Sequence, residues 1–317
     1  MPAPATLSVD LNALAHNFHA LEAISGVPVH PVVKADAYGL GAVPVARRLM
    51  AEGARTFFVA RASGGFALRK ALGAEPVIHV LDGCVGDGAA AMIAADLRPI
   101  LNHGGQLAAW QAAGLGLVLS HLACGDAPDS PMNRQQRDAF AAAVQRYPGV
   151  VRSFANSGGV FLGPDFGFDA VRPGISLYGG GPEGRPDARL KPVATFEAEV
   201  LQVRDVPAGE SVGYSQGFRA ETPRRIAICA AGYADGVLRS TSPWGAVWLG
   251  GALRSIVGRV SMDVITVDVT GSDVALGDRA ELFGANRSLD EAATAAGTIA
   301  YELLTSVTPR VPRVYIG

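Results

Sequence analysis

The first half of the chain alternates short apolar runs with alanine-rich stretches of helical spacing. The runs at 29–33 and 56–59 are rich in β-branched and aromatic residues, as strands buried on both faces are. Similar runs follow at 76–81, 97–101, 116–122, 151–155 and 170–177. Segments with helical periodicity lie between most of them, at 43–54, 65–72, 88–95 and 106–113. Strands alternating with helices predict a parallel α/β sheet, and this many units favours a closed (β/α) barrel over an open sheet.

From about Lys191 the pattern changes to short β-rich runs separated by Gly, Pro and Asp. These runs predict a mainly antiparallel β domain, with short helices near 289–296 and 300–304. The Gly- and Pro-rich segment 179–192 is a natural linker. We therefore expect a TIM-like barrel over residues 1–185 and a C-terminal β domain over 186–317. Residues 1–10 end in an alternating apolar and polar pattern, so they can pair with the C-terminal domain.

Composition excludes several classes of protein. No apolar run in the 317 residues approaches the length that crosses a bilayer, although mean hydropathy is +0.23. The 27 basic and 29 acidic residues are interspersed, which leaves no charged patch for nucleic acid or an anionic membrane. The N-terminus lacks the basic and apolar regions of a signal peptide. Three widely spaced cysteines indicate a reducing compartment, with neither a disulfide framework nor a metal site, so we expect a cytoplasmic protein.

The stretch HPVVKADAYGLG places Lys34 at the end of an apolar run and follows it with turn residues. A buried lysine needs a partner or a chemical role. In the structural interpretation, Lys34 pairs with Asp36 or another carboxylate at the strand end. In the functional one, desolvation frees the lone pair of the amine to form a Schiff base with an aldehyde such as pyridoxal phosphate. Tyr38 could then give its hydroxyl to the phosphate.

Three later segments carry polar groups at or just after predicted strands. In VRPGISLYGG, Arg172 is either a solvated turn residue or a cation beside a backbone that can approach an anion at Gly174. In FANSGG, Asn156 and Ser157 fit an ordinary turn or an anion site. In SHLACGDAPDS, His121 is either a core residue or a site residue. Strand ends of a barrel meet at one face, so we expect these groups to gather there.

Taken in order, these segments resemble the alanine racemase family. Its lysine signature is a valine pair, Lys, Ala, an Asx residue, Ala, Tyr, Gly, any residue and Gly. The resemblance implies that Lys34 carries pyridoxal 5'-phosphate and that Arg172 faces the pyridine nitrogen. The other cofactor-binding residues that it implies are Tyr38, His121, Asn156, Ser157, Gly174 and Ile175.

The resemblance extends into the β domain. SVGYSQGF, GYADG and GRVSMD contain Tyr214, Tyr233 and Met262, which the family implies as a general base and two substrate-binding groups. It also implies that Asp126 and Arg259 lie near the site entrance. A racemase removes a proton from one face of Cα and returns one to the other, so it needs two bases.

Lys34 and Tyr214 supply such a pair. Tyrosine is a poor base near neutral pH, so His121 with Arg172 behind it is the candidate relay that stabilises the phenolate. In the family the tyrosine reaches the site from the partner subunit, which implies a homodimer with Tyr214 and Met262 in the partner's site.

The resemblance implies racemisation of L- and D-alanine, which supplies D-alanine for peptidoglycan. Two alternatives stay open. One is a racemase of broader or different amino acid specificity. The other is a non-catalytic protein that binds pyridoxal phosphate.

One block of the family is missing. Nothing fits its Lys-x-Asp-Thr-Gly-Met-x-Arg strand, whose arginine contacts cofactor and substrate carboxylate, and we find seven barrel runs where a barrel has eight. The junction falls at 111–116. Either the chain lacks this strand or the sequence omits a stretch there, and we favour the second because losing a barrel strand should be severely destabilising. Pro309 also stands where many relatives have an entrance tyrosine.

Overall fold

The structure is a computed structural model that describes residues 3–84, 88–103, 105–106, 116–243 and 245–317. It divides into two compact units. The barrel unit consists of Ala13–Glu183 with Asp187–Lys191. The β unit consists of Met1–Asn12, Gly184–Pro186 and Pro192–Gly317.

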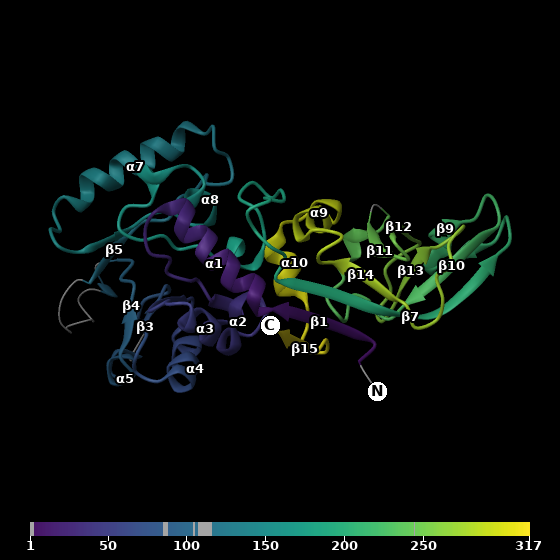
Figure 1. Cartoon of the computed structure of the whole chain (residues 1–317), viewed down its shortest axis with the longest axis horizontal. Coiled ribbons are helices and arrows are strands. Elements are labelled where there is room, and N and C mark those ends of the chain that lie inside the picture. Colours follow the sequence, from purple (N-terminus) through teal and green to yellow (C-terminus); the bar gives the residue numbers. More distant parts are fainter. Residues whose placement is uncertain (1–2, 85–87, 104, 107–115, 244) are drawn as a thin grey trace. The chain divides into compact units, whose positions relative to one another are not determined.

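Parallel strands form the wall of the barrel unit (Figure 1). Two parallel sheets contain β2 (Thr56–Val59), β3 (Val77–Val80) and β4 (Leu97–Pro99), and β5 (Leu117–Leu119) with β6 (Val151–Ser153). Parallel bridges join these sheets through Val32 to Phe58, Val29 to Val171 and Ser153 to Ala170. The resulting order is β4, β3, β2, the segment around 29–32, the segment 170–171, β6 and β5. The expected α/β barrel architecture is thereby confirmed.

Amphipathic helices cover this wall. The first helix buries an apolar stripe formed by Leu14, Phe18 and Leu21. The helices of the unit are α1 (Leu11–Ser25), α3 (Ala42–Ala51), α4 (Ala62–Leu72), α5 (Ala89–Ala94), α7 (Pro131–Val144) and α8 (Ser157–Val160). The helix expected at 106–113 falls almost wholly outside the described residues.

Two predicted strands are shorter than their apolar runs. The run at 29–33 takes part in the wall only through bridges at Val29 and Val32. The run at 170–177 bridges only at its start and then becomes a 3-10 helix, η3 (Ile175–Tyr178). The prediction of one continuous strand there was wrong because Pro173 has no N–H for a strand ladder and Gly174 favours a turn.

The β unit is antiparallel around one long strand, β7 (Ala194–Val206). This strand pairs with both β14 and β10, so the order β10, β13, β12, β11, β14, β7 closes on itself. The other strands are β1 (Ala5–Asp10), β8 (Ser211–Val212), β9 (Phe218–Arg219), β10 (Arg224–Cys229), β11 (Ala246–Leu249), β12 (Ala252–Val257), β13 (Ile265–Asp268), β14 (Arg279–Phe283) and β15 (Arg313–Ile316). The expected antiparallel β domain is confirmed.

The N-terminal strand belongs to this unit. β1 pairs with β7 in antiparallel fashion and with β15 in parallel. Two helices complete the unit, α9 (Leu289–Ala295) and α10 (Ala300–Ser306). Ser288 and Glu291 form a capping box at the start of α9, which explains why that helix begins there.

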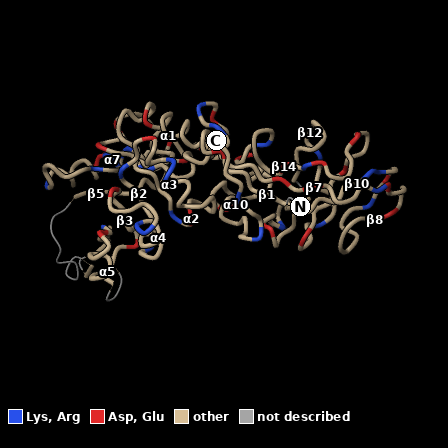
Figure 2. The backbone as a smooth tube through the Cα atoms, turned by 60° about the horizontal axis from the view of Figure 1, so that its bottom comes forward, with Lys and Arg blue, Asp and Glu red and all other residues tan. Residues whose placement is uncertain are grey.

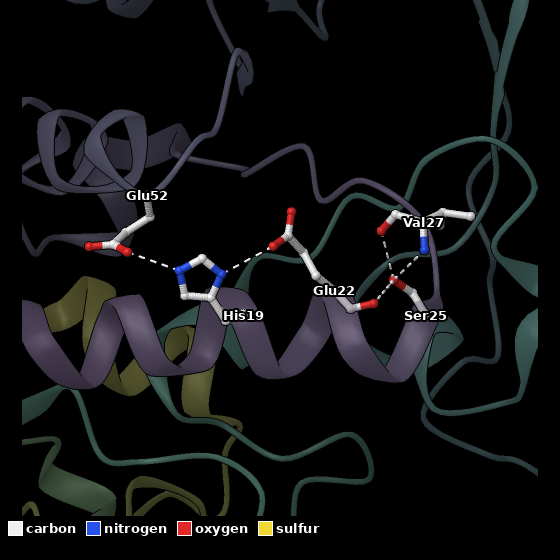
Figure 3. A network of polar contacts seen from close by, with 5 residues as sticks. All are labelled: His19, Glu22, Ser25, Val27 and Glu52. Atoms are coloured by element: carbon white, nitrogen blue, oxygen red, sulfur yellow. Dashed lines mark hydrogen bonds and ion pairs between the residues drawn. The ribbon is translucent and has the colours of Figure 1, made fainter.

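Polar contacts connect the end of α1 with its surroundings (Figure 3). His19 Nε2 lies 2.9 Å from the Glu52 carboxylate, which follows α3, and its Nδ1 lies 3.2 Å from Glu22. Ser25 Oγ donates to the Val27 carbonyl at 3.0 Å. The hydrogen bond to Glu52 and the charge of Glu22 raise the pKa of His19. These contacts fix the chain that leads into the segment 29–33.

Charge is mixed along the described backbone. Lys and Arg are interspersed with Asp and Glu in both units (Figure 2). Of the helices in the described ranges, none combines the length and apolar character needed to cross a membrane.

Candidate active site

Lys34 begins a short turn with a left-handed backbone, α2 (Lys34–Tyr38). The φ angles of Ala35, Asp36, Ala37 and Tyr38 are 51°, 55°, 53° and 58°. Each L residue in this region costs about 1–2 kcal/mol, so such a run persists only where the surroundings impose it. Strain of this kind concentrates at functional sites.

The contacts of Asp36 explain how the turn is held. Its carboxylate accepts the N–H of Ala42 at 2.7 Å, and its carbonyl accepts the N–H of Gly41 at 2.8 Å. Asp36 therefore anchors the start of α3. Among the ion pairs of the described residues, none involves Lys34. The pairing of Lys34 with Asp36 that the structural interpretation expected is absent, and the amine of Lys34 is available for chemistry.

Four residues build a cradle for an anion next to this turn. Tyr38 is buried, and its Oη lies so close to Gly174 that a methyl group on Gly174 would be 2.1 Å from it. Ser157 Oγ accepts the N–H groups of Gly174 at 2.9 Å and Ser176 at 3.3 Å, which leaves its own proton to donate. Ser176 Oγ is buried and has no partner among the described residues. Converging hydroxyl and amide donors of this kind suit a phosphate.

Tyr178 supports the cradle from behind, and sequence reasoning missed it. Its ring lies 5.0 Å from that of Tyr38, and its hydroxyl donates to the Val32 carbonyl at 3.0 Å. Burial raises the pKa of Tyr178 well above its ordinary value, so the hydroxyl keeps its proton. The contact ties the cradle to the strand end that precedes Lys34. No local spacing pattern could have shown it, because Tyr178 and Val32 are far apart in sequence.

Arg172 is buried in the barrel unit with only 4% of its surface exposed. Its guanidinium donates to Ser153 Oγ and to the Ser120 carbonyl, each at 2.7 Å, and lies 5.8 Å from the centre of the Phe58 ring. Burial lowers its pKa to about 10, so it remains a cation at neutral pH. Ser153 and Phe58, which hold the cation, were not predicted.

Asn156 connects the His121 loop to α8. Its side chain donates to the Leu122 carbonyl at 3.1 Å and accepts the N–H of Gly159 at 3.0 Å. Its Nδ2 lies 3.5 Å from His121 Nε2. Asn156 therefore positions the loop and helix that carry His121 and Ser157.

The expected relay from Arg172 to His121 has no direct contact in the described residues. No hydrogen bond joins the two, since Arg172 donates to Ser153 and Ser120. Partial burial of the ring, with the charges of Arg172 and Lys34, lowers the pKa of His121. Of the remaining predicted groups, Ile175 is buried at the start of η3, and Asp126 is exposed.

Two further histidines flank the Phe58 ring. The rings of His79 and His30 lie 4.9 Å and 6.4 Å from it. Burial lowers the pKa of His30 to about 4, helped by the charge of Arg172. Burial likewise lowers the pKa of His79 to about 4, with a contribution from Arg98. Both are therefore neutral at physiological pH.

In the β unit the predicted site residues are exposed. Tyr214 begins η4 (Tyr214–Gln216) and is 72% exposed, Met262 is 53% exposed and Tyr233 is 42% exposed. Arg259 Nη1 donates to Ser215 Oγ at 3.2 Å, next to Tyr214. These side chains have the solvent access that contact with another molecule requires.

The loops under these side chains are tightly held. The N–H of Tyr233 donates to the Ser261 carbonyl at 3.0 Å. Arg310, which sequence reasoning missed, bridges the carboxylates of Asp235 at 2.9 Å and Asp263 at 2.7 Å. Asp235 is buried, so Arg310 compensates a charge that would otherwise be isolated. The loops that carry Tyr233 and Met262 therefore have a fixed backbone and exposed side chains.

The fold and the site define a class of protein. A parallel barrel presents a lysine without an ion-pair partner in the described ranges, beside a cradle that suits a phosphate and a buried arginine, and an antiparallel β domain follows in sequence. The buried, unpartnered hydroxyl of Ser176 among the described residues fits the phosphate of pyridoxal 5'-phosphate, and the glycine at 174 lets the Tyr38 hydroxyl approach the same cradle. These features define a pyridoxal phosphate-dependent barrel enzyme.

Comparisons with known proteins give the family. The model "Alanine racemase, N-terminal domain" matches residues 9–117 and 114–182, and "Alanine racemase, C-terminal domain" matches residues 193–315. An alanine racemase of Cereibacter sphaeroides is 41% identical over 349 aligned positions, which cover 99% of this chain and 98% of the relative. A catabolic alanine racemase of Mesorhizobium japonicum is 39% identical over 361 positions, 99% of this chain and 94% of the relative.

Solved structures of alanine racemases have folds similar to that of this chain. The alanine racemase of Bartonella henselae, crystallised with covalently bound pyridoxal phosphate, has a TM-score of 0.95 at 35% identity and covers 99% of this chain and 100% of its own. The biosynthetic alanine racemase of Pseudomonas aeruginosa has a TM-score of 0.92 at 34% identity and covers 99% of both chains. The chain belongs to the alanine racemase family, whose members are pyridoxal phosphate-dependent isomerases.

The comparisons also locate the missing block. The two N-terminal matches overlap at residues 114–117, within or directly after the predicted junction at 111–116. The alignments with relatives are longer than the 317 residues of this chain, so the relatives have residues with no counterpart here. This sequence contains no residues that fit the arginine-bearing segment, and both explanations of the missing block stay predictions.

Proposed function

We propose that this chain interconverts L- and D-alanine with Lys34 and Tyr214 as its two bases. The observation that carries the proposal is the position of Lys34, which has no carboxylate partner in the described residues and shares a short turn with Tyr38 of the phosphate cradle. Family membership supports alanine as the substrate.

The residues of this chain each have a defined task in that reaction. Bound pyridoxal phosphate would withdraw electrons from the substrate and so acidify its Cα proton. Tyr38, Ser157 and the amide of Gly174 would hold the phosphate. Arg172 would face the ring nitrogen, and a guanidinium does not readily transfer its proton, which limits electron withdrawal and favours simple return of the proton to Cα.

The proton itself moves between the chain's two bases. Lys34 removes or returns it on one face of Cα, and Tyr214 acts on the other. A phenol is a poor base near neutral pH, so the phenolate needs a hydrogen-bond partner, and we assign that role to His121. The lowered pKa of His121 supports it as a neutral partner.

We further propose a homodimer in which Tyr214 and Met262 complete the partner's site. Both side chains are more than half exposed, and hydrogen bonds and the Arg310 ion pairs hold the backbone of the Met262 loop. Tyr233 lies on the same set of loops and would contact the substrate, while Arg259 and Asp126 would line the entrance. Met262 would present its backbone N–H to the substrate carboxylate.

A cytoplasmic location and a role in supplying D-alanine for peptidoglycan complete the proposal. The three cysteines are all free thiols, two of them buried, which suits a reducing compartment.

A second candidate is a racemase of broader or different amino acid specificity. The observation that favours it is the absent arginine segment at 114–117, because a substrate contact has been lost with it. The two candidates share the cofactor site and differ only in which amino acid undergoes exchange.

One experiment tests both candidates. The holo-protein is incubated in deuterium oxide with L- and D-alanine, serine and lysine, and deuterium at Cα is followed by mass spectrometry. Alanine as the preferred substrate supports the first candidate, and another amino acid supports the second. Bound cofactor without any exchange would instead indicate a non-catalytic binding protein.

The position of the cofactor has its own test. The chain has only three lysines, Lys34, Lys70 and Lys191, so borohydride reduction and peptide mapping give an unambiguous answer. We expect the pyridoxyl group on Lys34, and Lys34→Ala should lose the visible absorbance and at least about three orders of magnitude in exchange rate. The exposed control Lys70→Ala should keep both, and a Lys34→Ala protein that retained the absorbance would refute the assignment.

A further inference from the structure

Arg98 stands at one end of a row of side chains in the barrel unit. The register of the parallel strands pairs Phe58 with His79 and His79 with Arg98, so the three residues lie side by side on β2, β3 and β4. In the described ranges, β4 has β3 as its one neighbour, and the row ends at Arg98.

The row faces away from the covering helices. Side chains alternate between the two faces of a strand. A methyl group on Gly65 of α4 would lie 2.9 Å from Leu97 and 3.5 Å from Val80, so these two side chains point toward the helix. Their neighbours His79 and Arg98 therefore point to the opposite face, where His79 is buried and Arg98 is exposed.

Other contacts place the row beside the cofactor machinery. The ring of Phe58 lies 4.9 Å from His79 and 5.8 Å from the guanidinium of Arg172. Burial, then the charge of Arg98, and also those of His30 and Arg172, lower the pKa of His79. Arg98 therefore lies next to His79 on the sheet face that carries Phe58, whose ring contacts Arg172.

Arg98 is free to bind an anion. It is exposed, and none of the ion pairs of the described residues includes it. The sequence from 99 to 125 contains no Asp or Glu at all. A methyl group on Gly116, just before β5, would lie 4.0 Å from Nη1 of Arg98. It is also the only Lys or Arg between Lys70 and Arg134.

We infer that Arg98 binds the α-carboxylate of the amino acid substrate in this chain. The inference rests on the proposed function and extends it to a specific contact. A guanidinium pairs with a carboxylate through two parallel hydrogen bonds, which also orients the substrate. Lys34 and Arg172 already have tasks with the cofactor. Arg98 is therefore the cation that this part of the chain can offer in place of the absent segment.

The test compares substrates with and without the carboxylate. Arg98→Gln should raise KM for alanine about ten- to a hundredfold, the usual effect of losing a hydrogen bond to a charged group. Exchange into alaninamide, which lacks the carboxylate, should change less than about twofold, and Arg98→Lys should recover part of the loss. The control Arg146→Gln removes an exposed arginine from the same unit and should leave both substrates unaffected.

A second readout does not depend on turnover. Binding of propionate to the holo-protein, measured by titration calorimetry, should weaken in Arg98→Gln and stay unchanged in Arg146→Gln. Equal effects on alanine and alaninamide, or unchanged propionate binding, would overturn the role of Arg98. Wild-type protein that binds propionate through Arg98 yet exchanges no amino acid would refute the proposed function alone.

Discussion

Most of the predicted cofactor-binding residues are buried in the barrel unit, whereas the predicted site residues of the β unit are exposed. In the barrel unit Arg172, Ser157 and Tyr38 are buried, and Arg172 and Ser157 have short hydrogen bonds to neighbouring residues. In the β unit Tyr214 and Met262 are more than half exposed, and hydrogen bonds hold the backbone of the Met262 loop. All six histidines lie at or before residue 121, so the β unit has none.

This contrast separates two kinds of preorganisation. The barrel unit fixes the groups that we propose hold the cofactor, with backbone strain and buried charge. In the β unit the proposed site residues Tyr214, Tyr233 and Met262 are exposed. In the proposed dimer each site needs groups from both units, so changes in the two units should have different effects.

The largest expected effect is the loss of the base on one face. Tyr214→Phe should slow exchange from one enantiomer by about 10²- to 10⁴-fold while the other enantiomer and cofactor affinity change far less. The measurement is the initial rate of deuterium entry from each enantiomer. Tyr147→Phe, an exposed tyrosine of the barrel unit, is the control. Equal loss for both enantiomers would count against a role as a base.

The second largest expected effect is a difference between the two units in how acid lowers their stability. His30 and His79 have a pKa of about 4 when folded and near 6.5 when unfolded, so the unfolded chain binds more protons between these values. Their contribution to the free energy of unfolding is complete above pH 6.5 and is lost as the pH falls to 4. The loss is up to about 3 kcal/mol for each histidine. The barrel unit should therefore lose stability in this window before the β unit.

Urea unfolding at several pH values, followed by pulsed hydrogen exchange at one common pH, reports each unit separately. Peptides of the barrel unit should lose protection at lower urea as the pH falls from 6.5 to 4. His79→Phe, which keeps a ring against Phe58, should reduce that pH dependence. A β unit that unfolded first, or a dependence that His79→Phe left unchanged, would contradict this account.

The smallest effect concerns the cradle. A methyl group in Gly174→Ala would lie 2.1 Å from Tyr38 Oη, so the ring or the backbone must shift at a cost of about 1–3 kcal/mol. Pyridoxal phosphate should bind correspondingly more weakly, measured by absorbance titration. At Gly64 a methyl group would be 3.7 Å from Val59, an ordinary contact, so Gly64→Ala is the control. Unchanged cofactor affinity in Gly174→Ala would contradict the role of Gly174 in the phosphate cradle.

Local patterns predicted much of this molecule because they depend on neighbouring residues. Apolar β-branched runs located β2 and β3, and the motifs around Lys34 and Arg172 located the residues of the proposed cofactor site. The left-handed turn at 35–38 was not predictable, because the segment has no glycine to signal it. Tyr178 and Ser153 act on residues distant in sequence or across strands, and only the folded chain brings those partners together.

The central claim is that one site takes Lys34 from one chain and Tyr214 from its partner. Lys34→Ala and Tyr214→Phe chains with different tags are unfolded together, refolded with cofactor and compared with each variant alone. If Tyr214 acts on the partner's site, each mixed dimer contains one intact site, and a one-to-one mixture should recover about a quarter of wild-type exchange. If both residues act within one chain, no mixed dimer contains an intact site, and activity no greater than that of the separate variants would contradict the account.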